Sequence, residues 1–172
     1  MKIIQTYNFK KHMEAHKKEF LVPYEELIDY VVRRNLLNFN KEKICKLTVE
    51  FPFSVGYCNL VKTNSADRII YAKRKGREIY TRFVLNRTPI KVNKCVFILN
   101  QNHNKDNEYY LITMFPGENC VKEPQDKYIQ SEEELKESLN FWAEHAIIFQ
   151  EDVIDTSTVV EECPYYVKRL IV

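Results

Sequence analysis

Five short segments rich in Ile, Val, Tyr, Phe and Thr follow one another through the middle of the chain, and they constrain its fold more than any other feature. These strand-like segments are residues 43–53, 68–74, 78–86, 94–101 and 108–115. Their composition is typical of β-strands. Short polar links separate the later segments: Lys75-Gly76, residues 86–93 and residues 102–107. Because such links favour antiparallel neighbours, the sequence predicts one twisted antiparallel sheet of four to five strands.

Helical patterns lie on both sides of this block. Residues 8–22 show a moderate helical pattern. Residues 24–37 repeat apolar side chains at helical spacing, after two glutamates that suit the N-terminal end of a helix dipole. Residues 131–149 open with a capping box, Ser131 with Glu134, and continue with an apolar stripe. The sequence therefore predicts two N-terminal helices and one long C-terminal helix.

The order of helices, strands and helix defines the fold class. We predict a single α+β domain over residues 1–172, with the helices laid on one face of the antiparallel sheet. The β-prone tail, residues 156–172, can add an edge strand or pack as an extended arm.

The composition indicates a folded cytoplasmic protein. Of the 172 residues, 45% are hydrophobic. No stretch reaches the roughly 18 apolar residues of a membrane-spanning helix, and no export signal is evident, so we expect no membrane contact. The five cysteines stand apart without a CxxC motif, which favours neither a zinc site nor a disulfide framework. With three glycines the chain lacks a glycine-rich phosphate loop, and we expect no cofactor.

Positive charge is concentrated between residues 62 and 94. The whole chain has a formal net charge of +2, but this segment has ten Lys or Arg against Asp67 and Glu78. Alternation along residues 78–86 places Tyr80 and Arg82 together, opposite a face that we expect to enter the core. Further cations and a tyrosine lie near them across the predicted turn at Lys75-Gly76: Tyr71, Lys73, Arg74 and Arg77.

Cations interleaved with aromatic rings suit single-stranded nucleic acid, because the cations meet phosphates and the rings offer stacking surfaces. We therefore expect the guanidinium groups to converge on one concave wall that accepts a polyanion. The alternative is a solvated sheet face without a ligand.

Two histidine motifs are candidates for proton transfer. His12 and His16 share a helix face at i, i+4 and can hold zinc, but Glu14 is not at the metalloprotease spacing and no third ligand is obvious. We therefore predict a solvated helix and no metal, with His16 still able to transfer a proton. His145 follows Trp142 by three residues, and it is either a core histidine held by a backbone carbonyl or a catalytic group.

Thr113 lies in the middle of the strand-like segment 108–115. Strict alternation places it on the same face as Tyr109, Leu111 and Phe115. It is either a simple β-former or a hydroxyl offered to a phosphate from the sheet face.

Three stretches, RIIYAKRKGREIYTRFVLNR, EYYLITMFPGE and SLNFWAEHA, occur in this order between residues 54 and 148. This pattern resembles small bacterial and phage proteins that are similar to the barnase/RelE-like superfamily of endoribonucleases. The resemblance implies an antiparallel sheet with N-terminal helices and a shallow cleft. It also implies cleavage of RNA by attack of the ribose 2′-OH on its own phosphate, without a metal or cofactor.

The resemblance implies roles for particular residues, in a toxin or a phage- or defence-associated protein. The implied catalytic residues are Arg77 and Arg82 to clamp the phosphate, Thr113 or Tyr80 to orient it, and His16 or His145 to transfer the proton. The residues expected to bind nucleic acid are Lys73, Arg74, Lys75, Arg87 and Tyr71. RNA is the expected partner, together with a protein that neutralises the toxin.

Two other functions fit the same sequence. The basic sheet can belong to a non-catalytic module that binds nucleic acid or an acidic protein. Alternatively, the acidic region 118–162 can pair with the basic region of a second copy.

Overall fold

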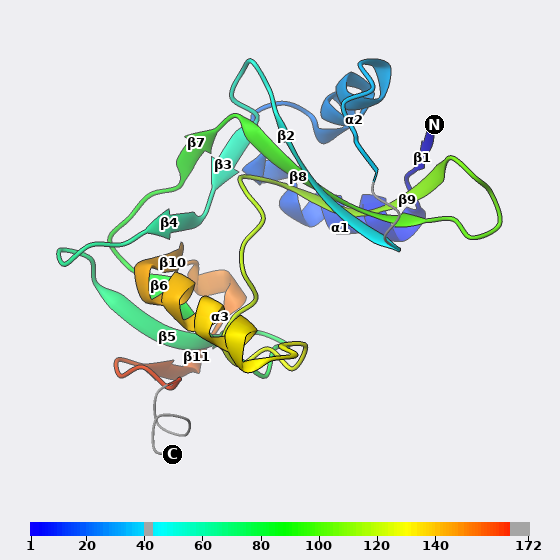
Figure 1. Ribbon diagram of the computed structural model, residues 1–172. Helices are drawn as coiled ribbons and strands as arrows, with labels where there is room; N and C mark the ends of the chain where they lie inside the picture. The colour runs from blue at the N-terminus through cyan, green and yellow to red at the C-terminus, as the bar shows by residue number, and fades with distance from the viewer. Residues whose placement is uncertain (40–42, 166–172) are drawn as a thin grey trace. The chain divides into compact units, whose positions relative to one another are not determined.

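The computed structural model describes residues 1–39 and 43–165, which form two compact units (Figure 1). Of these described residues, unit 1 comprises those within 1–58 and 90–119, and unit 2 comprises those within 59–89 and 120–165. Each unit has its own sheet and its own buried apolar cluster. The prediction of one domain over residues 1–172 stays a prediction.

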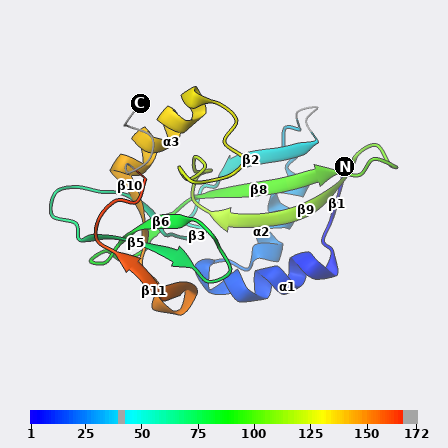
Figure 2. The same ribbon diagram turned by 90° about the horizontal axis from the view of Figure 1, so that it is seen from below.

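Unit 1 is built on a four-stranded sheet with the order β1-β9-β8-β2. Its strands are β1 Lys2–Ile4, β2 Ile44–Glu50, β8 Lys94–Gln101 and β9 Glu108–Pro116. The other elements are α1 Tyr7–His16, the 3-10 turn η1 Lys17–Glu19, α2 Tyr24–Arg33, and the strand pair β3 Gly56–Cys58 with β7 Ile90–Val92. Helix α1 runs beside β9, as Figures 1 and 2 both show.

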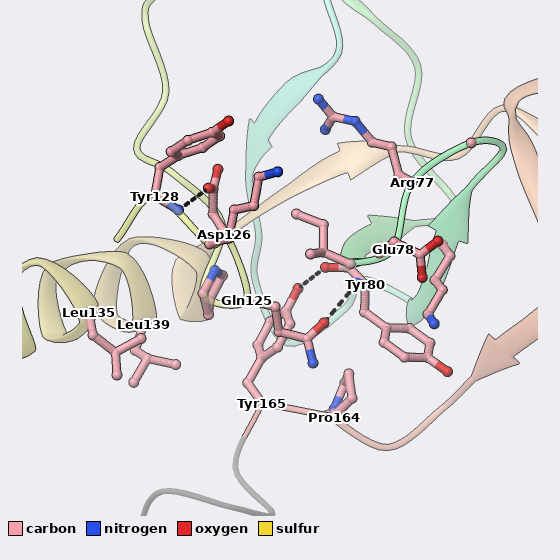
Figure 3. Close-up of a pocket in the computed structure, with 15 residues that line it drawn as sticks. Arg77, Glu78, Tyr80, Gln125, Asp126, Tyr128, Leu135, Leu139, Pro164 and Tyr165 are labelled. Carbon is pink, nitrogen blue, oxygen red and sulfur yellow. Dashed lines mark hydrogen bonds between the residues drawn. The ribbon is translucent and has the colours of Figure 1, made fainter. Parts of the chain in front are cut away.

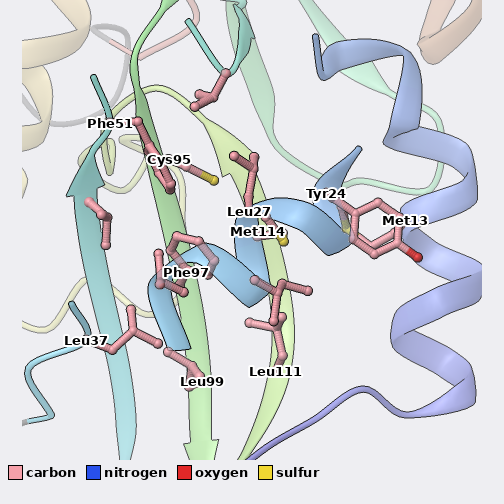
Figure 4. Close-up of a cluster of buried hydrophobic side chains, with 14 of the residues drawn as sticks. Met13, Tyr24, Leu27, Leu37, Phe51, Cys95, Phe97, Leu99, Leu111 and Met114 are labelled. Atoms are coloured by element: carbon pink, nitrogen blue, oxygen red, sulfur yellow. The ribbon is translucent and has the colours of Figure 1, made fainter. Parts of the chain in front are cut away.

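The core of unit 1 lies between the two helices and the sheet (Figure 4). Alternate residues of β8 enter it, so that Cys95, Phe97 and Leu99 are fully buried. From the helices, Met13 and Leu27 are also fully buried. Burial of each large apolar side chain contributes about 1.5–3 kcal/mol, so this core fixes α1 against the sheet.

A β-bulge interrupts β9 in the middle of the strand. Ile98 pairs with Thr113, but the next residue of β8, Leu99, pairs with Leu111, which leaves Ile112 as the extra residue. Leu111 and Met114 are therefore both buried although they are three residues apart. The prediction of strict alternation along residues 108–115 is wrong for this reason.

Unit 2 is built on a five-stranded sheet with the order β11-β5-β6-β10-β4. Its strands are β4 Leu60–Lys62, β5 Ile69–Arg74, β6 Tyr80–Val84, β10 His145–Ile148 and β11 Ile154–Val160. Helix α3 Glu132–Glu144 precedes β10, and the 3-10 turn η2 Glu151–Val153 precedes β11. Gly76, with φ +79°, sits in the tight turn between β5 and β6, a conformation that favours glycine.

Each face of the unit 2 sheet carries a buried apolar cluster. One buried cluster contains Val61, Val84, Ala146 and Ile148, and the other contains Ile70, Ala72, Phe83 and Ile154. The predicted core face comprises Ile79, Thr81, Phe83 and Leu85. Thr81 and Phe83 are fully buried, as predicted, whereas Ile79 is only partly buried and Leu85 is 37% exposed. The opposite face, which carries Arg82, is not a simple solvated surface, because Val84 on that face is fully buried as well.

Local predictions agree with the structure. The class is α+β, and the three α-helices of the described residues begin within one residue of the predicted starts, although α1 ends at His16 and α2 at Arg33, before the predicted ends at residues 22 and 37. Ser131 caps α3 by accepting a hydrogen bond from the Glu134 N–H at 3.1 Å. The hairpins β5–β6 and β8–β9 are antiparallel, and β11 adds an edge strand beside β5. Of the predicted tail, residues 166–172 lie outside the described part of the chain.

Non-local predictions are wrong in three respects. The strands form separate sheets rather than one meander, and the link 86–93 does not join neighbours, because β6 and β8 belong to different sheets. The sheets are not purely antiparallel, since β1 pairs with β9 and β10 with β6 in parallel. Residues 145–148 form strand β10 rather than the end of a helix. They lie between β6 and β4, and their backbone groups pair with both of these strands.

None of the helices in the described residues is both long enough and apolar enough to cross a membrane.

Candidate functional site

Four polar side chains of unit 1 form a chain of contacts, which we call the histidine–threonine cluster: His12, His16, Glu19 and Thr113. His12 Nε2 lies 3.0 Å from Thr113 Oγ1, although the two residues are 101 positions apart in the sequence. His16 Nδ1 lies 3.0 Å from Glu19 Oε1. The two imidazole rings are neighbours, with centroids 4.6 Å apart. The cluster therefore brings two of the predicted catalytic residues, His16 and Thr113, to one place.

The local fold explains this placement. Helix α1 starts at Thr6, whose Oγ1 accepts a hydrogen bond from the Phe9 N–H at 3.2 Å. Phe9 and Met13 anchor one side of the helix in the core, so His12 and His16 share a face outside the core. On β9, the bulge at Ile112 changes the direction of the following side chains, and the Thr113 hydroxyl meets His12.

The two histidines have opposite protonation tendencies. Burial, followed by the nearby His16, lowers the pKa of His12 below the ordinary 6.5. The hydrogen bond to Glu19 raises the pKa of His16 above 6.5. As the pH rises, His12 therefore loses its proton before His16 does. Catalysis by a base and an acid at the same pH requires two such groups with different pKa values.

Sequence reasoning missed His12 and Glu19 as members of this cluster. In the HMEAH motif the sequence predicts a proton-transfer role for His16 but none for His12. Within residues 1–39 and 43–165 no group of three or more His, Cys, Asp or Glu side chains is arranged to hold a metal. The i, i+3 spacing of His16 and Glu19 is visible in the sequence and predicts their contact. No local signal predicts the contact between His12 and Thr113.

In unit 2, a buried carboxylate holds two of the predicted cations. Glu123, with 9% of its side chain exposed, lies 3.0 Å from Arg74 Nη2 and 3.6 Å from Arg77 Nη1. The buried Thr81 hydroxyl also donates a hydrogen bond to this carboxylate. Arg74 is largely buried, whereas 53% of the Arg77 side chain is exposed. Arg74 therefore has a structural role, and Arg77 still reaches solvent.

Arg82 and Arg87 are also bonded within unit 2. Arg82 Nη1 donates to Thr63 Oγ1 at 2.9 Å and to the His145 carbonyl at 3.0 Å. Arg87 binds Asp67 through Nε at 2.7 Å and through Nη2 at 2.9 Å. The expected wall of converging guanidinium groups is therefore not observed for Arg74, Arg82 and Arg87, whose contacts hold the fold together.

Tyr71 and His145 are held by neighbouring groups. The Tyr71 ring meets Tyr165 edge-on, and burial raises the pKa of the Tyr71 hydroxyl to about 12. His145 Nδ1 lies 2.9 Å from the Phe141 carbonyl, and its ring stacks on the Phe141 ring. Because a carbonyl only accepts, Nδ1 carries a hydrogen. His145 is thus held by a backbone carbonyl, as one of the two predicted alternatives requires, but it begins β10 instead of lying in a helix.

A groove of about 860 Å³ lies within unit 2 (Figure 3). Its cations are Lys73, Arg77 and Lys127, its tyrosines are Tyr80, Tyr128 and Tyr165, and its apolar side chains include Leu135 and Leu139. The groove therefore brings together Lys73, Arg77 and Tyr80 from the predicted site. Lys75 belongs to the same hairpin as these residues but does not line the groove.

Comparisons with protein-family models, with curated proteins and with solved structures find no match to this chain.

Proposed function

We propose that the protein is a cytoplasmic, metal-independent endoribonuclease whose proton transfers are made by the histidine–threonine cluster. The observation that carries this proposal is the 3.0 Å contact between His12 Nε2 and Thr113 Oγ1, beside a second histidine with a raised pKa. It supports the proposal because a base, a hydroxyl donor and an acid are the groups that cleavage of RNA by its own 2′-OH requires.

The reaction needs three events at one phosphate. Neutral His12 takes the proton of the ribose 2′-OH, and the oxygen attacks phosphorus. Thr113 donates a hydrogen bond to a phosphate oxygen and stabilises the added negative charge. Protonated His16 gives its proton to the departing 5′-oxygen. The new P–O2′ bond replaces the P–O5′ bond, so the products are a 2′,3′-cyclic phosphate and a 5′-hydroxyl.

Cations of unit 2 supply the binding part of the proposal. Arg77 and Lys73 line the groove, and we propose that they contact phosphates. Tyr80 lines the same groove, and we propose that it contacts RNA there. Arg82 and His145 are held by contacts within unit 2 and take no part in the proposed proton transfers. Arg74, Lys75, Arg87 and Tyr71 support the RNA-binding hairpin in this proposal. In a cell such an enzyme acts as a toxin, with a neutralising protein as its partner.

The decisive experiment uses purified protein and end-labelled RNA in EDTA. We expect fragments that end in 2′,3′-cyclic phosphate. The matched control is the same oligonucleotide with a single 2′-deoxy nucleotide at the cleaved position, which should stay intact there because the attacking hydroxyl is absent. Intact RNA, or equal cleavage of the 2′-deoxy substrate, would rule out this function.

The pH dependence of cleavage follows from the two histidines. His12 accepts a proton only when neutral, and its pKa is lowered, so the acidic limb should lie below pH 6.5. His16 donates only when protonated, and its pKa is raised, so the basic limb should lie above pH 6.5. We expect a bell-shaped profile of kcat/KM.

The variant Glu19→Gln tests the assignment of the basic limb. It removes the carboxylate that raises the pKa of His16, so the basic limb should move to lower pH while the acidic limb moves little. Glu14→Gln is the matched control, because Glu14 is exposed on α1 and its carboxylate lies 2.9 Å from Lys17 Nζ. A basic limb that stays in place in Glu19→Gln would contradict the role of His16 as the acid.

A second candidate is a module that binds RNA without cleaving it, and the groove of unit 2 is the observation that favours it. In that case RNA stays intact and its affinity falls steeply as salt is raised.

A further inference from the structure

We propose that the groove of unit 2 binds a nucleotide with a carbonyl at position 4 of a pyrimidine or position 6 of a purine (uracil, thymine or guanine), rather than cytosine or adenine, which carry an amino group there. The groove shares no residue with the histidine–threonine cluster. The inference therefore concerns binding alone and stands whether or not the chain cleaves RNA.

The orientation of Gln125 gives the groove its hydrogen-bond donors. Gln125 Oε1 lies 2.9 Å from the backbone nitrogen of Tyr80 (Figure 3). A backbone N–H only donates, so the oxygen of the Gln125 amide must face the strand. The amide nitrogen, with two hydrogens, is then directed away from the strand, and it makes no hydrogen bond to another residue in the part of the chain that the structure describes.

A second contact fixes the other backbone group of Tyr80. The Tyr165 hydroxyl donates to the Tyr80 carbonyl at 2.8 Å, so side chains satisfy both polar backbone groups of this residue (Figure 3). A ligand therefore meets the donors of Gln125 and not an open strand edge. This arrangement favours a ligand that accepts hydrogen bonds over a peptide that adds to the sheet.

Aromatic and apolar surface offers a place for a flat ring. Tyr128 is 64% exposed, and its backbone N–H donates to Asp126 Oδ1 at 2.8 Å, which fixes the loop that presents it. Leu135 and Leu139 of α3 line the same groove. A base that stacks on Tyr128 covers apolar surface that is otherwise in water, and stacking of this kind tolerates any base.

Two cations near the Tyr80 ring provide a binding place for the phosphate of the nucleotide. The Lys73 ammonium lies 5.2 Å from the centroid of the Tyr80 ring, and the exposed Arg77 lines the same groove. Two carboxylates, Glu78 and Asp126, also line it, but Asp126 already accepts the Tyr128 N–H. The volume of about 860 Å³ lies within the range of small-ligand sites and accommodates a nucleotide.

The choice of base follows from the Gln125 donors. Thymine and uracil present the O4 carbonyl and guanine the O6 carbonyl, where cytosine and adenine present an amino group. In the proposed complex the Gln125 amide nitrogen faces position 4 or 6 of the base, where an amino group would set a donor against a donor. We therefore expect a preference for the carbonyl bases of roughly tenfold or more.

The test measures binding of fluorescent oligo-dT and oligo-dC to the full chain. DNA is used because it lacks the 2′-OH, so the result does not depend on cleavage. We expect the unchanged protein to bind oligo-dT roughly tenfold more tightly than oligo-dC. The variant Gln125→Glu keeps the oxygen that accepts the Tyr80 N–H but exchanges the donor for an acceptor, so the preference should turn toward oligo-dC.

Tyr128→Ala should weaken both oligonucleotides about equally, by roughly tenfold, because stacking is lost without a change in base readout. Tyr110→Ala, an exposed tyrosine of β9 in unit 1, is the control and should bind like the unchanged protein. Equal affinity for oligo-dT and oligo-dC, an unaltered preference in Gln125→Glu, or binding of acidic peptides in place of oligonucleotides would overturn the proposal. If the protein cleaves RNA but binds oligo-dT and oligo-dC equally, the proposal for the groove is wrong and the endoribonuclease proposal stands. If it prefers oligo-dT but cleaves no RNA, the endoribonuclease proposal is wrong and the proposal for the groove stands.

Discussion

Replacing His12 with alanine should lower the rate of RNA cleavage about 10²–10⁴-fold, since this is the usual contribution of a positioned general base. His12 is the group of the cluster that is neutral near pH 7 and that touches Thr113. The loss should appear mainly in kcat, because the imidazole acts on the reacting proton rather than on the rest of the RNA. The measurement is single-turnover cleavage of labelled RNA in EDTA.

Thr113→Val completes this test, because valine keeps the shape of threonine and removes only the hydroxyl. We expect a loss of about 10²–10³-fold if the hydroxyl stabilises the charged phosphate. Thr48→Val is the matched control, since Thr48 is an exposed threonine of β2 in the same sheet. The double variant of His12 and Thr113 should be little worse than the worse single variant, because the two groups act together.

Measuring the stability of both variants distinguishes a loss of catalysis from a loss of folding. The His12–Thr113 contact is exposed, so its loss should change the free energy of unfolding by no more than about 1 kcal/mol. If both variants fold normally and cleave RNA as fast as the unchanged protein, the cluster takes no part in the reaction.

The sequence predicts the elements of this protein well where local chemistry determines them. Ser131 starts α3 because its hydroxyl satisfies a helix N–H, and Gly76 permits the turn between β5 and β6. Each of these signals lies within a few residues of the structure it specifies. The helices and the two hairpins therefore follow from the sequence alone.

The sheet arrangement could not be predicted in this way. Strand β10 reads as the end of a helix because Ala146 continues the apolar spacing of α3. The open edges of β6 and β4 decide its conformation, and both are distant in the sequence. The bulge at Ile112 likewise depends on the pairing of β9 with β8, which no periodicity reveals.

The charge pattern shows the same limit for the candidate site. Ten cations between residues 62 and 94 predicted a wall of guanidinium groups. Asp67, 20 positions before Arg87, and Glu123, 49 positions after Arg74, bind those arginines in the folded chain. A count of charges along the sequence cannot show which cation meets a carboxylate in space. Lys73 and Arg77, which the sequence places on either side of the turn at Lys75-Gly76, do line the same groove.

Loss of the Glu123 carboxylate should have the largest effect on stability. Glu123→Ala removes the partner of the largely buried Arg74 and the acceptor of the fully buried Thr81 hydroxyl. The fully buried Thr81 hydroxyl loses its acceptor, whereas Arg74, 31% exposed, can still be solvated, so we expect the free energy of unfolding to fall by about 1–3 kcal/mol. Chemical denaturation monitored by Trp142, which is buried in unit 2, measures it.

Two further variants identify the cause of that loss. Glu123→Gln keeps an acceptor for Thr81 but removes the negative charge. Its free energy of unfolding should therefore lie between those of the unchanged protein and Glu123→Ala. Glu118→Ala is the matched control, because Glu118 pairs with Lys94 on the surface and 66% of its side chain is exposed, so stability should not change measurably.

Glu123 also precedes Gln125 and Tyr128 in one loop, so the variant Glu123→Ala should weaken oligonucleotide binding in the groove even where the chain remains folded. A Glu123→Ala protein as stable as the Glu118→Ala control would show that the arginines of this hairpin do not depend on Glu123, and that they are free to meet phosphates.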